Sequence, residues 1–523
     1  MGGADGTKAV KRFLCAGAVL ALLFSFWLQM FLALPKLSAT TDEVAHLPAG
    51  YTYWVTRDFR LNPEHPPLVK LIAALPLLAI GPRLDLSWPE WKDRQQYTFG
   101  FGFLYTNDAD RLLFWGRLPM TLIATLGGLI VFLWARDMFG TASGLFALGL
   151  FAFSPNLLAH GMLVTTDVPV AVFMTLALYL FWRQAQHPST AMSIGIGLAV
   201  GAAMACKFSG AILPLILIAF SGWRVAAAPD RRRQILVETR LLVIAGVSAL
   251  LVIEAAYLFS MPPWTYFSNL RSVNWNRNPN HMSYLFGNFS RTRFSHYFVL
   301  AFSVKATVPL LLATVLASLH FCIKRFIDSR GEMLLLVGIA SYLAALTIGA
   351  DDLGVRYLLP VFLLLFIWSS RIVVELNRKA AGILVMIILV GWQAHAALAA
   401  FPNYIAYFNE IIGGAQAGIY YLDDSNVDWG QGMKQAADYV HSHNLENVEM
   451  LPFSMYQSPR YYGINRPLRD DLDTYRMMIS DERHPGTYIV SAHHLTRMMY
   501  IRPEWNPRNA VDRIGESFWV FRF

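Results

Sequence analysis

The stretch FLCAGAVLALLFSFWLQMFLAL, residues 13–34, decides the class of fold, because its 22 consecutive residues include no charged side chain. A helix needs about 20 apolar residues to cross the hydrocarbon core of a bilayer. Lys8, Lys11 and Arg12 precede the stretch, as basic residues do in a secretory signal. The apolar region of such a signal has about 7 to 15 residues. We therefore expect residues 13–34 to form a retained transmembrane helix.

The whole chain has the composition of a membrane protein. Of its 523 residues, 55% are hydrophobic and 15% are charged, whereas soluble proteins carry about 25% charged residues. These values exclude a cytosolic enzyme and a disordered chain. The net charge of +8 does not indicate nucleic-acid binding, because the cations lie between apolar runs. Cys15, Cys206 and Cys322 lie in or beside apolar runs and predict no disulfide framework or zinc cluster.

Hydropathy predicts an all-α polytopic protein with about eleven transmembrane helices. The predicted spans are 13–34, 112–135, 141–160, 165–183, 190–205, 208–224, 240–260, 298–321, 332–350, 354–371 and 380–400. Lys and Arg are enriched in cytoplasmic loops. If the N-terminus is cytoplasmic, every predicted inner loop is basic. The cations are Lys8, Lys11, Arg12, Arg136, Arg183, Arg224, Arg231 to Arg233, Lys324, Arg325, Arg330, Arg371, Arg378 and Lys379. The tail then lies on the outer side.

Two outer regions are too large to be simple connectors. Within residues 35–111, the segments 42–56 and 66–80 have the pattern of helices lying in the membrane interface. The tail predicts a helix over 424–444 and strands over 448–453, 487–491 and 517–523. We expect two domains: a transmembrane domain over residues 1–400 and a small periplasmic α/β domain over 401–523.

Ionisable residues at the outer ends of the predicted helices are the candidate functional groups. A charge at membrane depth costs at least about 2.5 to 3.5 kcal/mol and is usually functional. The set comprises Asp42, Glu43, Glu64, His65, Asp167, Lys207, Lys305, Asp351, Asp352 and Arg356. An acidic and basic cluster at the mouth of a helix bundle suits a phosphorylated substrate and a cation.

Each of these residues also has a structural interpretation. The sequence Thr41-Asp42-Glu43 suits a helix cap, and Asp167 suits another. Arg356 is placed to pair with Asp351 or Asp352. Lys207 and Lys305 are placed to extend toward the interface. Capping and catalysis do not exclude each other.

Together these motifs resemble the GT-C superfamily of membrane glycosyltransferases, in the branch of protein O-mannosyltransferases and aminoarabinose transferases. The motifs are the acid pair Asp42-Glu43, NPEHPPL at 62–68, TTD at 165–167, Lys207, VKATVPL at 304–310 and RYLLP at 356–360. The tail motifs YFNE at 407–410 and DSNVDWGQ at 424–431 look like those of bacterial members. The tail does not look like the β-trefoil insert of eukaryotic mannosyltransferases, which disfavours a protein acceptor.

The resemblance implies an inverting glycosyltransferase in the bacterial inner membrane, surrounded by membrane lipids. It would move a sugar from a polyprenyl phosphate to a periplasmic glycan or glycolipid, or less favourably to a protein. The acid pair would be catalytic, with Asp42 as the base and Glu43 beside it. Cations would neutralise the donor phosphate, and three further side chains would contact donor or acceptor. The cations are Lys207, Lys305 and Arg356, and the further side chains are Asp167, His65 and Tyr357.

A divalent metal is a further possibility that the sequence leaves open. Glu64 or the adjacent His65 would supply one ligand, and the distant His296 or one of Asp42, Glu43 and Asp167 would complete the site. Oxygen ligands would favour Mg²⁺ or Mn²⁺, and a histidine would admit Zn²⁺. Some relatives of this kind operate without an evident metal.

Two other classes of function fit the sequence less well than sugar transfer does. A transporter or flippase would show two related halves and charges near the midplane, whereas here the halves differ and the charges collect at one face. A catalytically silent scaffold would be favoured by loss of the acid pair, which this chain keeps.

Overall fold

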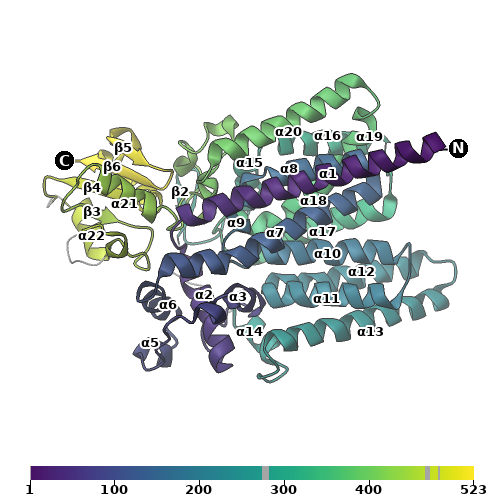
Figure 1. Ribbon diagram of the computed structural model, residues 1–523, viewed down its shortest axis with the longest axis horizontal. Coiled ribbons are helices and arrows are strands. Elements are labelled where there is room, and N and C mark those ends of the chain that lie inside the picture. The colour runs from purple at the N-terminus through teal and green to yellow at the C-terminus, as the bar shows by residue number, and fades with distance from the viewer. Residues whose placement is uncertain (1, 274–281, 325, 466–470, 481–482) are drawn as a thin grey trace.

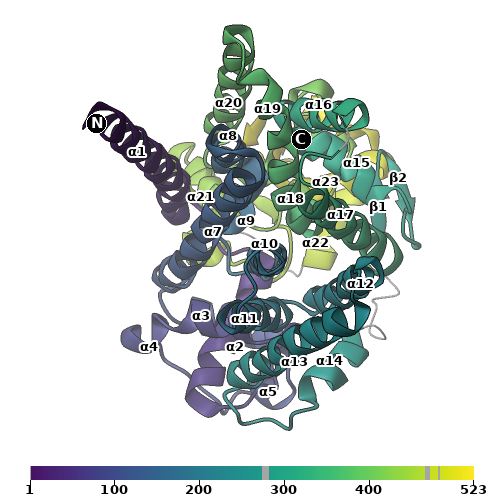
Figure 2. The same ribbon diagram turned by 90° about the vertical axis from the view of Figure 1, so that its right-hand side faces the viewer.

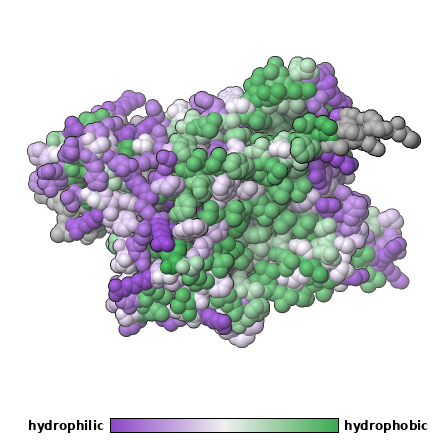
Figure 3. Space-filling view, viewed as in Figure 1, coloured by the Kyte–Doolittle hydropathy of each residue, from purple (hydrophilic) through white to green (hydrophobic). Residues whose placement is uncertain are grey.

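The computed structural model of the protein describes residues 2–273, 282–324, 326–465, 471–480 and 483–523. Long helices run side by side along the long axis of the molecule (Figure 1). The N-terminus lies at one end of the bundle, and a small β-sheet region covers the opposite end. Apolar residues form a broad band between two more polar ends (Figure 3). This arrangement confirms the predicted fold class, a polytopic all-α membrane protein with a small C-terminal α/β region.

Within the described residues, seven helices are long and apolar enough to cross a membrane, or nine if two bent pairs each count as one span. The seven spans contain α1 (Gly2–Ala33), α7 (Ala109–Phe139), α12 (Ile212–Ala227), α13 (Arg231–Ala256), α17 (Ser329–Gly349), α18 (Leu359–Ser369) and α20 (Ala380–Ala400). The bent pairs are α8 (Thr141–Ala152) with α9 (Pro155–Gly161), and α15 (Tyr297–Lys305) with α16 (Val308–Lys324).

The predicted count of eleven differs from this because two of the predicted helices do not meet the same limits. Helix α11 (Thr190–Cys206) has 17 residues and is one of the shorter apolar helices, and α10 (Asp167–Gln184) is not among the candidate spans. Helix α10 is nevertheless central. It packs against α7, α11 and α18, as the view along the bundle shows (Figure 2), so its first residue, Asp167, lies in the middle of one end of the bundle.

The predicted span 298–321 is sharply bent rather than straight. Helices α15 and α16 meet at 115°, and the bend leaves backbone carbonyls of Ser303 and Ala306 outside the regular helical pattern. The side-chain amide of Asn409 donates to both carbonyls, at 2.7 and 2.9 Å. A residue of the C-terminal tail therefore satisfies backbone groups within the transmembrane region.

Residues 35–111 form several helices that pack at one end of the bundle. These are α2 (Thr41–Thr56), α3 (Leu68–Ala74), α4 (Leu77–Ile80), α5 (Pro89–Lys92) and α6 (Gln96–Tyr105). Residues 43–53 of α2 are all buried, whereas a helix lying in the interface would leave one face exposed. Close packing requires Gly50, where a Cβ would collide with the carbonyl of Lys70.

The tail folds around a four-stranded sheet in the order β3-β4-β6-β5. The strands are β3 (Glu449–Leu451), β4 (Thr487–Ser491), β5 (Asp512–Ile514) and β6 (Phe518–Arg522). Strands β3 and β4 are parallel, and the other pairs are antiparallel. The helices are α21 (Met433–Ser442), α22 (Asp471–Ile479) and α23 (Ala492–Ile501). The predicted helix 424–444 begins only at Met433, because Gly430 has a φ of +99° and the preceding residues form an irregular segment.

Smaller elements complete the described chain. Helix α14 (Thr265–Val273) and the hairpin of β1 (Ser283–Leu285) and β2 (Asn288–Ser290) lie between α13 and α15. The short turn η3 (Val355–Leu358) precedes α18, and helix α19 (Val373–Leu376) follows α18.

Candidate functional site

Four charged side chains from distant parts of the sequence form one buried chain of ion pairs. Arg356 in η3 contacts Asp42 at 2.7 Å and Asp167 at 3.6 Å. Asp167 also contacts Lys207, at the end of α11, at 2.5 Å. The side chains of Asp167 and Arg356 are 2% and 7% exposed, and those of Lys207 and Asp42 are 15% and 17% exposed. All four were predicted from the sequence as site residues, and the structure brings them together.

Two aromatic rings border the cations of this cluster. The Lys207 ammonium lies 4.0 Å from the ring centre of Tyr357. The Arg356 guanidinium lies 4.1 Å from the ring centre of Trp429 and 5.2 Å from that of Tyr357. Such cation–π contacts hold a cation in a fixed place. The sequence predicts Tyr357 as a site residue. It assigns no role to Trp429, although this residue belongs to the DSNVDWGQ motif.

Glu43 occupies a different environment from its neighbour Asp42. Its carboxylate accepts from the backbone N–H of Thr40 and from that of Val164, each at 3.0 Å. Arg117 donates to both of its oxygens, at 2.8 and 2.7 Å. Burial opposes the charge of Glu43, but the Arg117 charge and these hydrogen bonds still hold its pKa below the ordinary value of 4.5. These contacts occupy the Glu43 carboxylate, so we assign it a positioning role in place of the predicted catalytic one.

Arg117 is a residue that the sequence reasoning missed. Its remaining N–H groups donate to the carbonyls of Leu34, Leu37 and Ser38, at 3.3, 3.0 and 2.7 Å. Arg117 therefore fixes the connection between α1 and α2, which leads directly to Asp42. The available signal was a single charge inside the apolar run 112–135.

His65 lies near the cluster, in a loop whose backbone carbonyls accept hydrogen bonds from a buried lysine. Its ring meets the ring of His46 edge-on, with centres 5.1 Å apart. Lys70 donates to the carbonyls of His65 and Asn62, at 2.8 and 2.7 Å. Burial lowers the pKa of Lys70 to about 7. Burial, followed by the charges of His46 and Lys207, places the pKa of His65 well below its ordinary value, so the ring is neutral at physiological pH.

The predicted metal ligands are not brought together. Glu64 accepts a hydrogen bond from Gln96, and His296 lies at the N-terminal cap of α15. In the described part of the chain, no group of three or more His, Cys, Asp or Glu side chains is placed to hold a metal ion. Asp42 and Asp167 are already paired with cations. The donor set therefore does not fit a metal, and no chemical step is assigned to one.

Lys305 is enclosed by the C-terminal tail. Its ammonium donates to the carbonyls of Ile405 and Asn426, each at 2.7 Å, and lies 4.3 Å from the ring centre of Phe408. The residue is 1% exposed. These contacts anchor the tail to the bend between α15 and α16, and they differ from the phosphate contact expected from the sequence.

Asp352 accepts a hydrogen bond from the backbone N–H of Phe294 at 2.7 Å.

Comparisons with known proteins give matches of the kind that the sequence motifs indicate. A family model described as dolichyl-phosphate-mannose-protein mannosyltransferase matches residues 110–258. No curated protein sequence matches the chain.

Among solved structures, ArnT from Cupriavidus metallidurans bound to undecaprenyl phosphate is 15% identical, with a TM-score of 0.51 over 96% of this chain and 97% of that one. Its apo state is 13% identical, with a TM-score of 0.52 over 97% of each chain. The oligosaccharyltransferase AglB from Archaeoglobus fulgidus, in complex with an inhibitory peptide and a dolichol-phosphate, is 12% identical, with a TM-score of 0.50 over 98% and 74%. At these identities the matches establish a shared fold.

Proposed function

We propose that this protein transfers a sugar from a polyprenyl phosphate to a glycan or lipid acceptor, with inversion at the anomeric carbon. The observation that carries the proposal is the buried chain of Asp42, Arg356, Asp167 and Lys207. It joins a carboxylate suited to accept a proton with two cations suited to a phosphate. A polyprenyl phosphate, undecaprenyl phosphate, is bound in the ArnT structure that shares this fold.

In the proposed reaction, Asp42 accepts the proton of the acceptor hydroxyl as that oxygen attacks the anomeric carbon. The bond from the anomeric carbon to the phosphate oxygen breaks, and its electron pair leaves with the phosphate. Because the leaving group is an anion, it requires positive charge rather than a proton donor. Lys207 and Arg356 supply that charge, with Arg356 offering two parallel N–H donors.

The charges of the cluster explain how donor binding would prepare the base. Without donor, two carboxylates and two cations neutralise each other. A donor phosphate competes with Asp42 for the guanidinium of Arg356, which releases the Asp42 carboxylate toward the acceptor. Asp167 keeps contact with Lys207 and holds that ammonium in place. Because these cations supply the charge compensation, we expect transfer to continue in the presence of a metal chelator.

We further propose that the site faces the periplasm of a bacterial inner membrane, with the N-terminus in the cytoplasm. Helix α2, which carries the acid pair in its first turn, and the C-terminal sheet region lie toward the end of the bundle opposite the N-terminus (Figure 1). The basic loops of the sequence support the same orientation. A periplasmic site would meet glycan and lipid acceptors of the cell envelope.

The test is release of polyprenyl phosphate by purified protein in nanodiscs, supplied with a panel of labelled polyprenyl-phosphate sugars and envelope lipid extract. We expect Asp42→Asn to lose activity by about 100-fold or more, since general base catalysis contributes about 10² to 10⁴. Asp58→Asn is the matched control, because Asp58 lies in the same region as Asp42, residues 35–111, and pairs with Arg60 at a partly exposed position. Equal release by the natural chain and Asp42→Asn would refute the proposed base. Equal loss in both variants would also refute it.

A further inference from the structure

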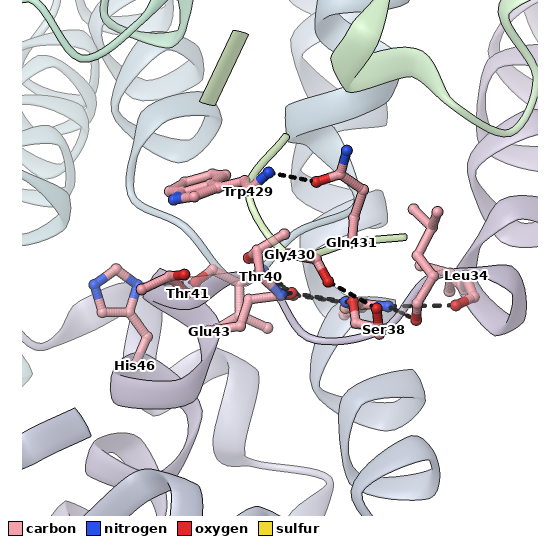
Figure 4. A network of polar contacts seen from close by, with 12 residues as sticks. Leu34, Ser38, Thr40, Thr41, Glu43, His46, Trp429, Gly430 and Gln431 are labelled. Carbon is pink, nitrogen blue, oxygen red and sulfur yellow. Dashed lines mark hydrogen bonds and ion pairs between the residues drawn. The ribbon is translucent and has the colours of Figure 1, made fainter. Parts of the chain in front are cut away.

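Residues 428–433 of the tail, which we call the strap, are hydrogen-bonded to the backbone that precedes the acid pair. The strap is a continuous piece of the DWGQ motif and the start of α21 (Figure 4). Its contacts are Thr41 N–H to the Trp429 carbonyl at 3.0 Å, Ser38 Oγ to the Gly430 carbonyl at 2.8 Å, Ser38 N–H to the Gln431 carbonyl at 3.1 Å, and Met433 N–H to Ser38 Oγ at 2.9 Å. The strap is therefore fixed to the segment that ends at Asp42.

The same strap covers one face of Arg356. The ring of Trp429 lies 4.1 Å from the guanidinium, and Trp429 is 2% exposed. Just before the strap, the side chain of Asn426 accepts from the backbone N–H of Val355 at 2.9 Å. The tail thus holds both the backbone beside Arg356 and the face of its side chain.

The local sequence of the strap suits this position. Gly430 has a φ of +99°, which side-chain-bearing residues rarely adopt. Its N–H donates to Asp428 Oδ1 at 3.0 Å, and the Trp429 N–H donates to the side chain of Gln431 at 2.7 Å. These internal bonds turn the Trp429 ring toward Arg356 while its carbonyl faces Thr41.

The orientation of Arg356 leaves part of its hydrogen-bonding capacity unused. One Nη donates to Asp42 at 2.7 Å. Its Nε is buried and, among the described residues, has no hydrogen-bond partner, and the same holds for Asp167 Oδ2. A buried donor without a partner is costly, so Arg356 Nε marks a place where an anionic ligand would complete the contacts, whereas Asp167 Oδ2 already faces an Nη of Arg356 at 3.6 Å.

We propose that Trp429 is a positioning residue that holds the Arg356 guanidinium for the phosphate of the donor, so that the C-terminal tail is an integral part of the catalytic site. This inference rests on the proposed function. The guanidinium lies over the Trp429 ring at 4.1 Å, and this contact uses none of its N–H donors, which remain available to Asp42 or, in its place, to the phosphate. Without the ring, Arg356 would turn to other partners, and donor binding would weaken before the chemistry does.

The test compares Trp429→Leu, which keeps apolar bulk, with Trp429→Phe, which keeps a ring. We expect Trp429→Leu to raise the KM for the donor by about tenfold with a smaller change in kcat, and Trp429→Phe to restore most of the affinity. The control is Trp505→Leu, because Trp505 is buried in the C-terminal sheet region against Phe521, with ring centres 5.0 Å apart. It should lower thermal stability and leave the donor KM of the folded protein unchanged.

A second measurement separates this inference from the proposed function. Binding of undecaprenyl phosphate itself is measured for the natural chain and for Trp429→Leu, and we expect about tenfold weaker binding by the variant. A natural chain that binds undecaprenyl phosphate but transfers no sugar would overturn the proposed function, while the binding ratio still decides the role of Trp429. Equal binding and equal KM in both chains would overturn the inference. No binding by the natural chain would overturn both.

Discussion

Replacing Glu43 by glutamine separates the roles of the two adjacent acids, because the structure gives Glu43 a structural partner and leaves Asp42 at the edge of the cluster. The change preserves size but removes the charge that balances Arg117, which is 1% exposed. Removing one member of a buried ion pair costs about 3 to 5 kcal/mol. The glutamine amide would also place N–H groups against donors of Arg117 or against the N–H of Thr40. We therefore expect a loss of stability within that range.

The assay is thermal unfolding in nanodiscs, followed by near-ultraviolet circular dichroism, with sugar transfer measured on the same preparation. Glu43→Gln should lower the melting temperature by several degrees, while protein that remains folded keeps most of its turnover. The carboxylate of Glu43 has a lowered pKa, so its contribution to stability is present above pH 4.5 and declines as the pH falls. That acid dependence should be weaker in the variant.

Glu446→Gln is the control, because Glu446 is exposed and surface changes usually stay within about 0.5 kcal/mol. If Glu43→Gln unfolds at the natural temperature and yet loses turnover as completely as Asp42→Asn does, Glu43 acts in the chemistry and the structural assignment is wrong.

Three further outcomes are expected. Lys207→Met should raise the donor KM by about tenfold or more, whereas Lys305→Met should lower the melting temperature without changing the donor KM, and a similar KM increase in both would contradict the assignment. Burial raises the pKa of Asp428 to about 7, so its contribution to stability is full below its ordinary value of 3.8 and is lost as the pH rises through about 7. The melting-temperature difference between the natural chain and Asp428→Asn should therefore change between about pH 4 and about pH 7, and a constant difference would refute this. Cysteine at the exposed position Ser442 should react with a membrane-impermeant maleimide in intact cells beyond the background of the parent chain, and reaction only after permeabilisation would contradict a periplasmic tail.

The sequence predicts well what depends on local composition. The apolar segments are helical in the structure, because hydropathy and length act on each segment separately. The sequence also predicts that Asp42, Asp167, Lys207 and Arg356 gather, since each stands on the same side of the predicted helix bundle. Orientation in the membrane then brings such residues to one level without any knowledge of packing.

Long-range packing accounts for the differences. Thr40 and Glu43 have the spacing of a capping box, and the structure forms one. Arg117, which pairs with Glu43, lies 74 residues further along the chain. The enclosure of Lys305 depends on a 115° bend and on tail residues about 100 positions later. The contact between the Trp429 ring and the Arg356 guanidinium likewise joins segments that no local pattern relates.

A structure of the protein with undecaprenyl phosphate tests the central claim most directly. The account predicts that the phosphate contacts Lys207 Nζ and the Arg356 guanidinium, and that the 2.7 Å contact between Arg356 and Asp42 opens. A phosphate bound elsewhere, with the contact between Arg356 and Asp42 intact, would contradict it.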